Sequence, residues 1–151
     1  MPDKKKDWIQ NTAAERISIQ FSIADGLDQK SGILFAYLGA VLIATIQLGN
    51  GHYGVWSLLG VSVGLLGIGL AIASLWPVTY DDPPDPEKLA DALLGDRPFT
   101  FEETQTELID EQLAAITKND AVLATKATSI KGAIVCATIA TVSVMLQEFA
   151  R

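Results

Sequence analysis

The longest stretch without a charged residue limits this chain more than any other feature. No Asp, Glu, Lys or Arg lies between Lys30 and Asp81, and almost every residue there is aliphatic, glycine or aromatic. One membrane-spanning helix needs roughly 20 apolar residues, so this stretch is long enough for two. Neither half shows the polar face expected of a helix hairpin buried in a water-soluble protein. The sequence therefore predicts an integral membrane protein with an N-terminal hairpin of two transmembrane helices.

The first transmembrane helix is expected from about Ser31 to Leu48, and the second from about Tyr53 to Trp76. The turn-forming residues 49–52 separate them. A helix that begins near Thr12 is expected to run without a break into the first span. Aromatic residues of the kind found at membrane interfaces flank the second span at both ends: Tyr53, Trp56, Trp76 and Tyr80.

Small residues form one face of the second predicted span. Gly60 and Gly64 are four residues apart, and Gly67 and Ala71 extend the same face. Small faces let helix backbones approach closely in lipid. Two interpretations remain open: this face packs on the first span of the same chain, or it forms a contact between subunits.

The segment after the second span begins as a stiff acidic linker. Pro77 ends the span, and residues 81–86 consist only of aspartate and proline, the second of which blocks helix formation. A short helix is expected over residues 86–94. Thr100 and Glu103 then have the spacing of a capping box, which predicts the start of a helix of about 48 residues.

The end of this long helix is also apolar. Residues 132–147 contain no charged side chain. Although the stretch is short for a span, Lys131 can extend its ammonium group to the interface. A third transmembrane helix is the favoured interpretation, and a cytoplasmic helix packed on a neighbour is the alternative.

Residues of the long helix recur at alternating steps of four and three, which is the pattern of a coiled-coil seam. Asp120, next to Asn119, is the polar exception. A carboxylate on a packed face needs a partner, and Arg16 and Lys30 are the candidates on the N-terminal helix. Asp120 either fixes the register or acts in ligand binding or gating. The predicted seam is Ile109, Leu113, Ile116, Asp120, Leu123, Ala127, Ile130 and Ile134.

Basic residues predict the orientation in the membrane. Five of the 11 precede the first span, five lie between the second and third, and none lies in the turn. The positive-inside rule then places the N-terminus and the middle segment in the cytoplasm. The expected organisation is a pre-membrane helix (1–30), a two-span hairpin (31–80), a cytoplasmic linker and heptad helix (81–130) and a third span (131–151).

The composition argues against several kinds of function. A net charge of −7 is unsuited to bulk nucleic-acid binding. The sequence shows no nucleophile–base pair, metal cluster or phosphate-binding loop, so we expect no enzyme activity, no cofactor and no metal. Basic residues near the membrane either serve topology and lipid contact or form a site for an anionic ligand: Lys30, Lys118, Lys126 and Lys131.

Two short segments resemble bacterial anti-phage membrane effectors. Asp28-Gln-Lys-Ser-Gly-Ile-Leu-Phe-Ala36 resembles the start of the first span in effectors of the Pycsar type. Lys118-Asn-Asp-Ala-Val-Leu-Ala-Thr-Lys126 resembles the helix before the last span in small effectors of the Pycsar, CBASS and Hailong systems. The resemblance implies a protein that assembles or opens as a pore in the bacterial inner membrane. The glycine face and the heptad seam predict a homo-oligomer, with a tetramer favoured. A nucleotide or oligonucleotide would then be the signal. The alternatives are a holin-like protein, a small membrane scaffold, or a subunit of a transport complex.

Overall fold

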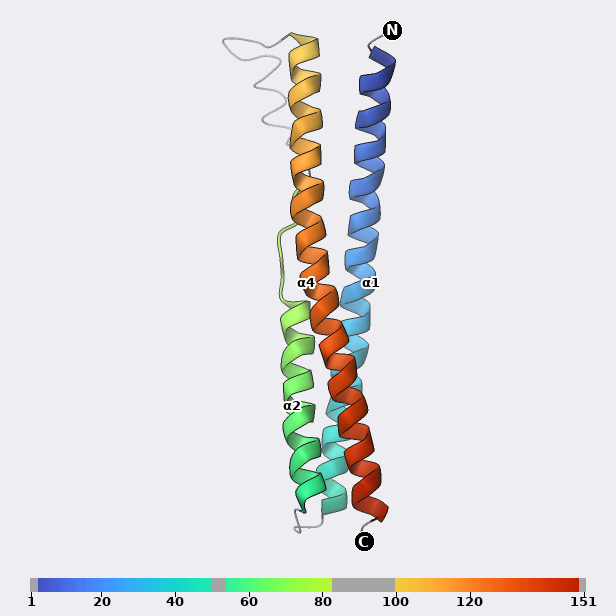
Figure 1. Cartoon of the computed structure of the whole chain (residues 1–151), viewed down its shortest axis with the longest axis vertical. Helices are drawn as coiled ribbons and strands as arrows, with labels where there is room; N and C mark the ends of the chain where they lie inside the picture. The colour runs from blue at the N-terminus through green and yellow to red at the C-terminus, as the bar shows by residue number, and fades with distance from the viewer. Residues whose placement is uncertain (1–2, 50–53, 83–99, 150–151) are drawn as a thin grey trace. The chain divides into compact units, whose positions relative to one another are not determined.

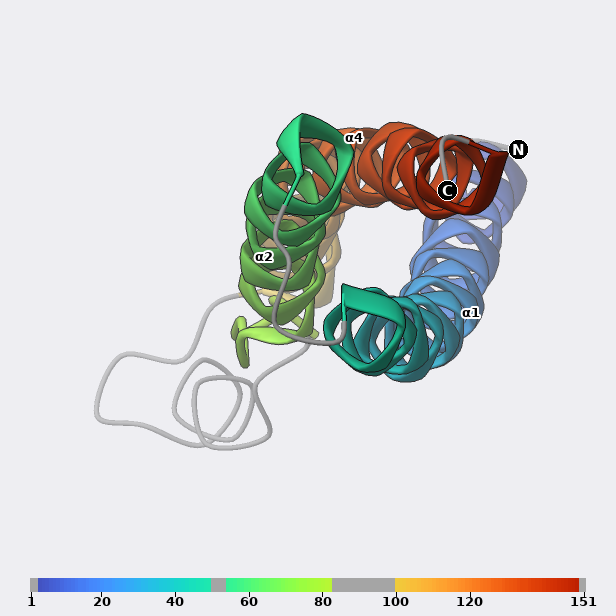
Figure 2. The same ribbon diagram turned by 90° about the horizontal axis from the view of Figure 1, so that it is seen from below.

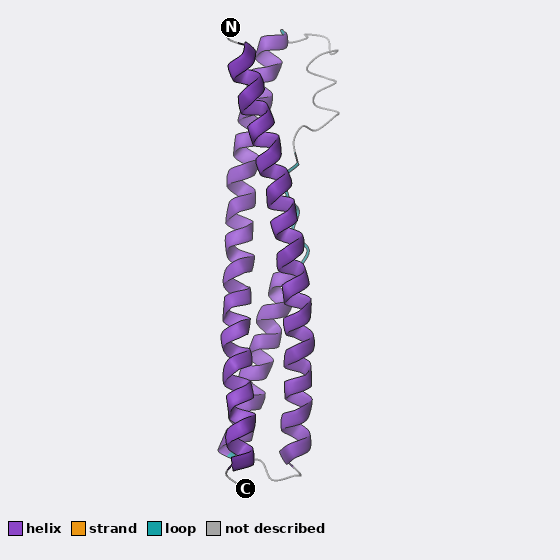
Figure 3. Ribbon diagram, turned by 90° about the vertical axis from the view of Figure 1, so that its right-hand side faces the viewer, coloured by secondary structure: helices purple, strands orange, loops and turns teal. Residues whose placement is uncertain are grey.

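The structure is a computed structural model that describes residues 3–49, 54–82 and 100–149. Within these ranges the regular structure is helical, without strands (Figure 3). Helix α1 spans Asp3–Gly49, α2 spans Val55–Leu75 and α4 spans Phe101–Phe149. The expected all-helical fold is confirmed. The predicted short helix over residues 86–94 and the centre of the turn, residues 50–53, lie outside the described residues.

Helix α1 begins earlier than expected. The sequence placed its start near Thr12, but the helix already begins at Asp3. The Thr12 hydroxyl donates a hydrogen bond to the carbonyl of Trp8, 2.8 Å away, which is the bond of a threonine inside a helix and not of an N-cap. Residues 3–11 contain neither glycine nor proline, so nothing in them interrupts the helix.

All three described helices are long and apolar enough to cross a membrane. Along α2, large apolar side chains such as Leu58, Leu65 and Leu66 are more than half exposed. On a helix of this composition, such an exposed surface suits contact with lipid chains. The structure thus supports a membrane protein with three candidate spans.

The chain divides into two compact units, and α1 and α4 contribute to both. One unit comprises Met1–Ala24 and Val78–Leu123, and we call it the polar unit because it contains most of the charged side chains. The other comprises Asp25–Pro77 and Ala124–Arg151, and we call it the apolar unit. Each is described by itself below.

In the apolar unit, α1 and α4 run in the same direction and α2 runs opposite to both (Figure 1). Seen from its end, the unit has the three helices at the corners of a triangle (Figure 2). The ends of α1 and α4 and the start of α2 therefore lie at the same end of this unit. Helix α2 buries only small residues, at steps of three and four: Ser57, Gly60, Gly64, Gly67, Ala71 and Ser74.

The glycine face of α2 packs inside the chain. A Cβ atom added at Gly67 would lie 2.8 Å from the Cβ of Cys136 and 3.0 Å from Leu38 Cδ1. One at Gly60 would lie 3.3 Å from the Cβ of Ser143. Of the two interpretations of this face, the structure has the intramolecular one, because the other two helices already occupy it. A contact between subunits through Gly60, Gly64 and Gly67 stays a prediction that the structure of a single chain does not test.

In the polar unit, α1 and α4 lie side by side and run in the same direction (Figure 1). The buried apolar side chains between them are mostly small: Ala13, Ile17, Ala24, Ala115 and Leu123. The capping box is confirmed. The Thr100 amide and hydroxyl donate to Glu103 Oε2 over 2.9 and 2.8 Å, and the Glu103 amide donates back to Thr100 Oγ1 over 3.3 Å.

Candidate functional site

The buried side of α4 differs from the predicted seam at every second position. Leu123 and Ile130 are buried as expected. Leu113 and Ile134 are each 48% exposed, and Asp120 is exposed as well. The residues that are buried in their place lie one position earlier, which is a rotation of roughly 100° about the helix axis. At Leu113 the predicted seam has the apolar residue, whereas the helix buries its polar neighbour Gln112.

Four polar side chains therefore line the buried side of α4 at steps of seven. They are Gln105, Gln112, Asn119 and Lys126, with exposed fractions of 6, 2, 1 and 5%. The same heptad position continues with small and polar residues at Ala133, Ala140 and Gln147, which are also buried. The sequence contained this signal, because a polar residue recurs at four consecutive steps of seven. A search limited to apolar periodicity missed it.

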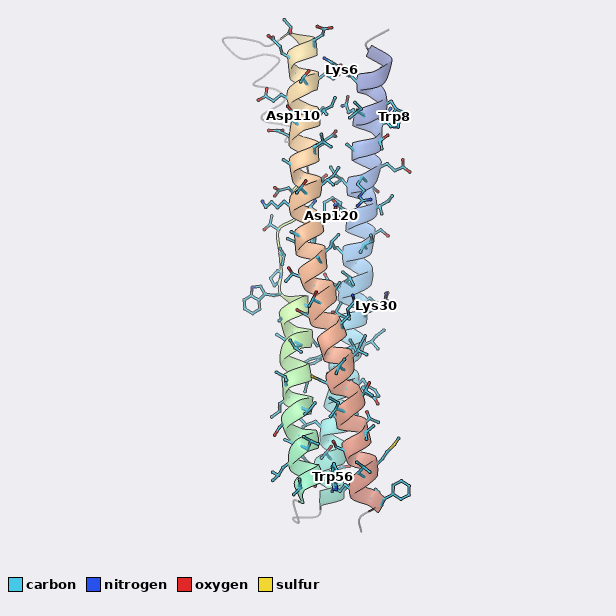
Figure 4. The ribbon with its side chains drawn as sticks, in the orientation of Figure 1. Lys6, Trp8, Lys30, Trp56, Asp110 and Asp120 are labelled. Atoms are coloured by element: carbon cyan, nitrogen blue, oxygen red, sulfur yellow. The ribbon has the colours of Figure 1, made fainter. Side chains whose placement is uncertain are left out.

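Asp120 is not a buried carboxylate, and this expectation was wrong. Its side chain is 47% exposed. It faces α1 (Figure 4), where Arg16 Nη2 lies 3.3 Å from Oδ2 and Gln20 Nε2 donates to Oδ1 over 2.8 Å. The structure thus places Arg16, one of the two expected partners, beside Asp120. The reason for its exposure is the helix rotation described above.

Asn119, and not Asp120, is the buried member of the pair, and its side chain binds the backbone of the segment that follows α2. Its Nδ2 donates to the carbonyl of Asp81 over 2.9 Å, and its Oδ1 accepts from the Asp81 amide over 3.0 Å. Lys118 Nζ contacts both carboxylate oxygens of Asp81 at 2.9 and 2.8 Å. The ring of Tyr80 packs edge-on against Phe21 of α1, with 5.9 Å between centroids. Residues 78–82, which we call the closing segment, are therefore fastened to both helices of this unit.

Lys126 is a buried cation in the apolar unit. Its Nζ lies 2.7 Å from Asp28 Oδ1 of α1, and the side chains are 5 and 43% exposed. Lys30 and Lys131 are exposed. Among the described residues of this unit, the three lysines therefore do not gather into a basic pocket. Lys118 and Lys126 each pair with an aspartate, and a site for an anionic ligand formed by Lys30, Lys118, Lys126 and Lys131 stays a prediction.

The polar unit also contains buried side-chain oxygens that could accept a hydrogen bond but have no described donor. The Oε1 atoms of Gln20, Gln105 and Gln112 are buried and accept no hydrogen bond from any residue that the structure describes. A buried acceptor without a partner costs about 1–3 kcal/mol. The helix pair is thus held together with polar groups that it satisfies incompletely, and a different packing that satisfied them would recover this energy.

Within residues 3–49, 54–82 and 100–149, no group of three or more His, Cys, Asp or Glu side chains could hold a metal ion. No protein-family model matches the chain, and no curated protein or solved structure is similar to it.

Proposed function

We propose that this chain is a self-assembling membrane effector that permeabilises the bacterial inner membrane when its polar unit receives a signal. Following the resemblance in its sequence, the setting is anti-phage defence and the signal is a nucleotide or oligonucleotide. The N-terminus and the polar unit lie in the cytoplasm. One chain contributes too few helices to enclose a water-filled path, so a pore requires several copies.

One observation carries the proposal: α1 and α4 each continue from a charged segment into a segment of membrane length without a break. A ligand that changes the packing of α1 on α4 in the polar unit acts on the same two helices that cross the membrane. A switch needs two packings that differ by only a few kcal/mol. The unpartnered glutamine oxygens and the small core side chains favour such a marginal packing.

The proposal is tested with purified full-length chain reconstituted into vesicles of bacterial polar lipids that contain a self-quenching dye. Without the signal, the wild type should release dye only slowly, and this release should still rise more steeply than linearly with the protein-to-lipid ratio, because several copies form one path. The Asn119→Ala variant, which loosens the closing segment, should release dye faster. Asp110→Asn should behave as wild type, since Asp110 is exposed and points away from α1 (Figure 4). Intact vesicles at every ratio, with both variants, would contradict the proposal.

The same experiment separates the alternatives. A holin-like protein would release dye at a rate that Asn119→Ala does not change, since no polar-unit switch controls it. A scaffold or transport-complex subunit would leave the vesicles intact. In cells, the effector should collapse the membrane potential on induction, measured with a voltage-sensitive dye. An adjacent gene for a nucleotidyltransferase favours the effector, and an adjacent endolysin gene favours the holin.

A further inference from the structure

Among residues 3–24, 78–82 and 100–123, the described part of the polar unit, no segment covers one side of the α1–α4 pair. The closing segment lies against Lys118 of α4. Asp120 is two residues further on, a rotation of roughly 200° about the helix axis, so it lies on the other side of the pair. There Ile9, Arg16 and Ile23 form one stripe of α1 at steps of seven, and Leu113 and Asp120 form one stripe of α4. The Arg16–Asp120 ion pair joins the two stripes, and we call these five residues the uncovered face.

The uncovered face is apolar at both ends and charged in the middle. Ile23 and Leu113 are each 48% exposed and Ile9 is 37% exposed. These residues belong to the charged parts of α1 and α4, where lipid chains are not available to cover them. Exposed aliphatic residues at heptad spacing on paired helices are the typical surface by which further helices associate.

We infer that a second copy of this chain docks on the uncovered face. This inference rests on the self-assembly in the proposed function and names the surface that carries it. The occupant follows from charge. The chain has a net charge of −7, so acidic surfaces of two copies repel each other. The uncovered face has one cation and one anion, with side chains 57 and 47% exposed. Two copies can therefore exchange Arg16–Asp120 pairs across a symmetric contact.

The apolar unit, taken by itself, offers a matching surface. A groove of about 300 Å³ lies between its α1 and α4, lined by residues such as Tyr37, Ile134, Thr138 and Thr141. Small and hydroxyl-bearing residues at such a surface suit helix contact in lipid. In the sequence, Tyr37 continues the steps of seven from Ile23, and Ile134 and Thr141 continue those from Leu113 and Asp120. Three of the residues that line the groove, Tyr37, Ile134 and Thr141, thus share the heptad positions of the uncovered face.

Cysteine cross-linking in bacterial membranes tests the inference. In a Cys136→Ala background, two variants with one cysteine each, Ile23→Cys and Leu113→Cys, should each give covalent dimers on treatment with a bismaleimide. The matched controls are their neighbours Ser22→Cys and Ala114→Cys, which are exposed but lie off the face. They should give about tenfold less dimer, because cross-linking requires proximity and not exposure alone. Equal yields at face and control positions, or no dimer at all, would overturn the inference.

Reversing the charges of Arg16 and Asp120 in separate chains tests the inference independently. Two differently tagged chains, one with Arg16→Asp and one with Asp120→Arg, should each self-associate about tenfold more weakly than wild type and should recover association when co-expressed. Failure to co-purify in detergent would overturn the inference.

Dye release keeps the two proposals apart. Dimers that form through the face in vesicles that do not leak would contradict the proposed function and leave the docking surface standing. Leakage without cross-linking at the face would contradict the docking surface and leave the proposed function standing.

Discussion

At the scale of single residues, the two ends of the Lys126–Asp28 pair differ in their surroundings. Lys126 is almost completely enclosed, whereas the Asp28 side chain is 43% exposed. Without its aspartate, Lys126 would lose a counter-charge that water cannot replace. Without its lysine, Asp28 can still be solvated. An enclosed charge is strongly destabilising only when it is left uncompensated, so the two deletions should have different effects.

We predict that Asp28→Ala lowers the stability by about 1–2 kcal/mol, because it leaves the enclosed ammonium with less compensation. Lys126→Met, which keeps the volume and removes the charge, should be nearly neutral. Thermal unfolding in detergent, followed by tryptophan fluorescence, measures both. Asp25→Ala is the control, since Asp25 is exposed on the same helix. A larger loss for Lys126→Met than for Asp28→Ala would contradict this assignment.

Asn119 is the residue that holds the closing segment. Asn119→Ala would leave the amide and the carbonyl of Asp81 without their partners, at a cost of about 1–3 kcal/mol. Lys118→Ala removes only a half-exposed ion pair, worth at most about 1 kcal/mol. Hydrogen exchange of a peptide that contains Asp81 should therefore accelerate much more in Asn119→Ala than in Lys118→Ala. Equal exchange rates in the two variants would show that the hydrogen bonds of Asn119 do not hold the closing segment.

The candidate site could be predicted from the sequence only in part. The pair Asn119–Asp120 was recognised, and Arg16 was identified as a partner. Which of the two polar residues is buried depends on the rotation of α4, and apolar periodicity fixes that rotation poorly when the buried residues are themselves polar. The role of Asp81 could not be predicted, because a hydrogen bond between an asparagine and the backbone of a distant segment has no local sequence signature.

At the scale of elements, the start of α4 depends on pH through its capping box. The backbone amide of Thr100, and then its hydroxyl, lower the pKa of Glu103 by hydrogen-bonding its carboxylate. Because the folded-state pKa is the lower one, the cap stabilises the helix fully above the unfolded-state pKa. This stabilisation is lost as the pH falls through the folded-state pKa.

Glu103→Gln should therefore reduce the hydrogen-exchange protection of the first turn of α4 at neutral pH. The difference from wild type should shrink in acid, where both side chains are uncharged. Glu102→Gln is the control, because it removes the same charge from the same turn without touching the capping box. If the difference in protection between Glu103→Gln and wild type were the same in acid as at neutral pH, the role of the carboxylate would be contradicted.

Helix α2 shows how one element depends on side-chain size at one face. Gly67 has no room for a Cβ, whereas a Cβ at Gly69 would meet nothing within 4 Å. Gly67→Leu should therefore separate α2 from the other two helices, at a cost of about 3 kcal/mol or more. Gly69→Leu should be tolerated, since its side chain would face lipid. Thermal unfolding in detergent compares the two, and equal stability would contradict the packing of the glycine face.

The helices themselves followed from simple rules. Charge-free length predicted the candidate spans, and the capping box located the start of α4 to the residue. The start of α1 was misplaced because Thr12 was taken as a helix boundary, although the residues before it are equally able to form a helix. Whether the glycine face served the same chain or a second copy could not be decided, since small residues permit close approach by either.

At the scale of the whole molecule, the central claim is that all three helices cross the membrane, with the N-terminus and the polar unit on the cytoplasmic side. Three crossings put the C-terminus on the opposite side from the segment between α2 and α4. In the apolar unit, the ends of α1 and α4 and the start of α2 lie at one end (Figures 1 and 2), as three crossings require. A packed helix that did not cross would leave its end on the cytoplasmic side.

Paired topology reporters test this claim most directly. Alkaline phosphatase, active only outside the cytoplasm, and green fluorescent protein, fluorescent inside it, are each fused after Arg151 and, in separate chains, after Pro84. The phosphatase should be active only after Arg151, and the fluorescent protein should be bright only after Pro84. Bright fluorescence from the fusion after Arg151 would contradict the third crossing, and an active phosphatase after Pro84 would contradict the orientation.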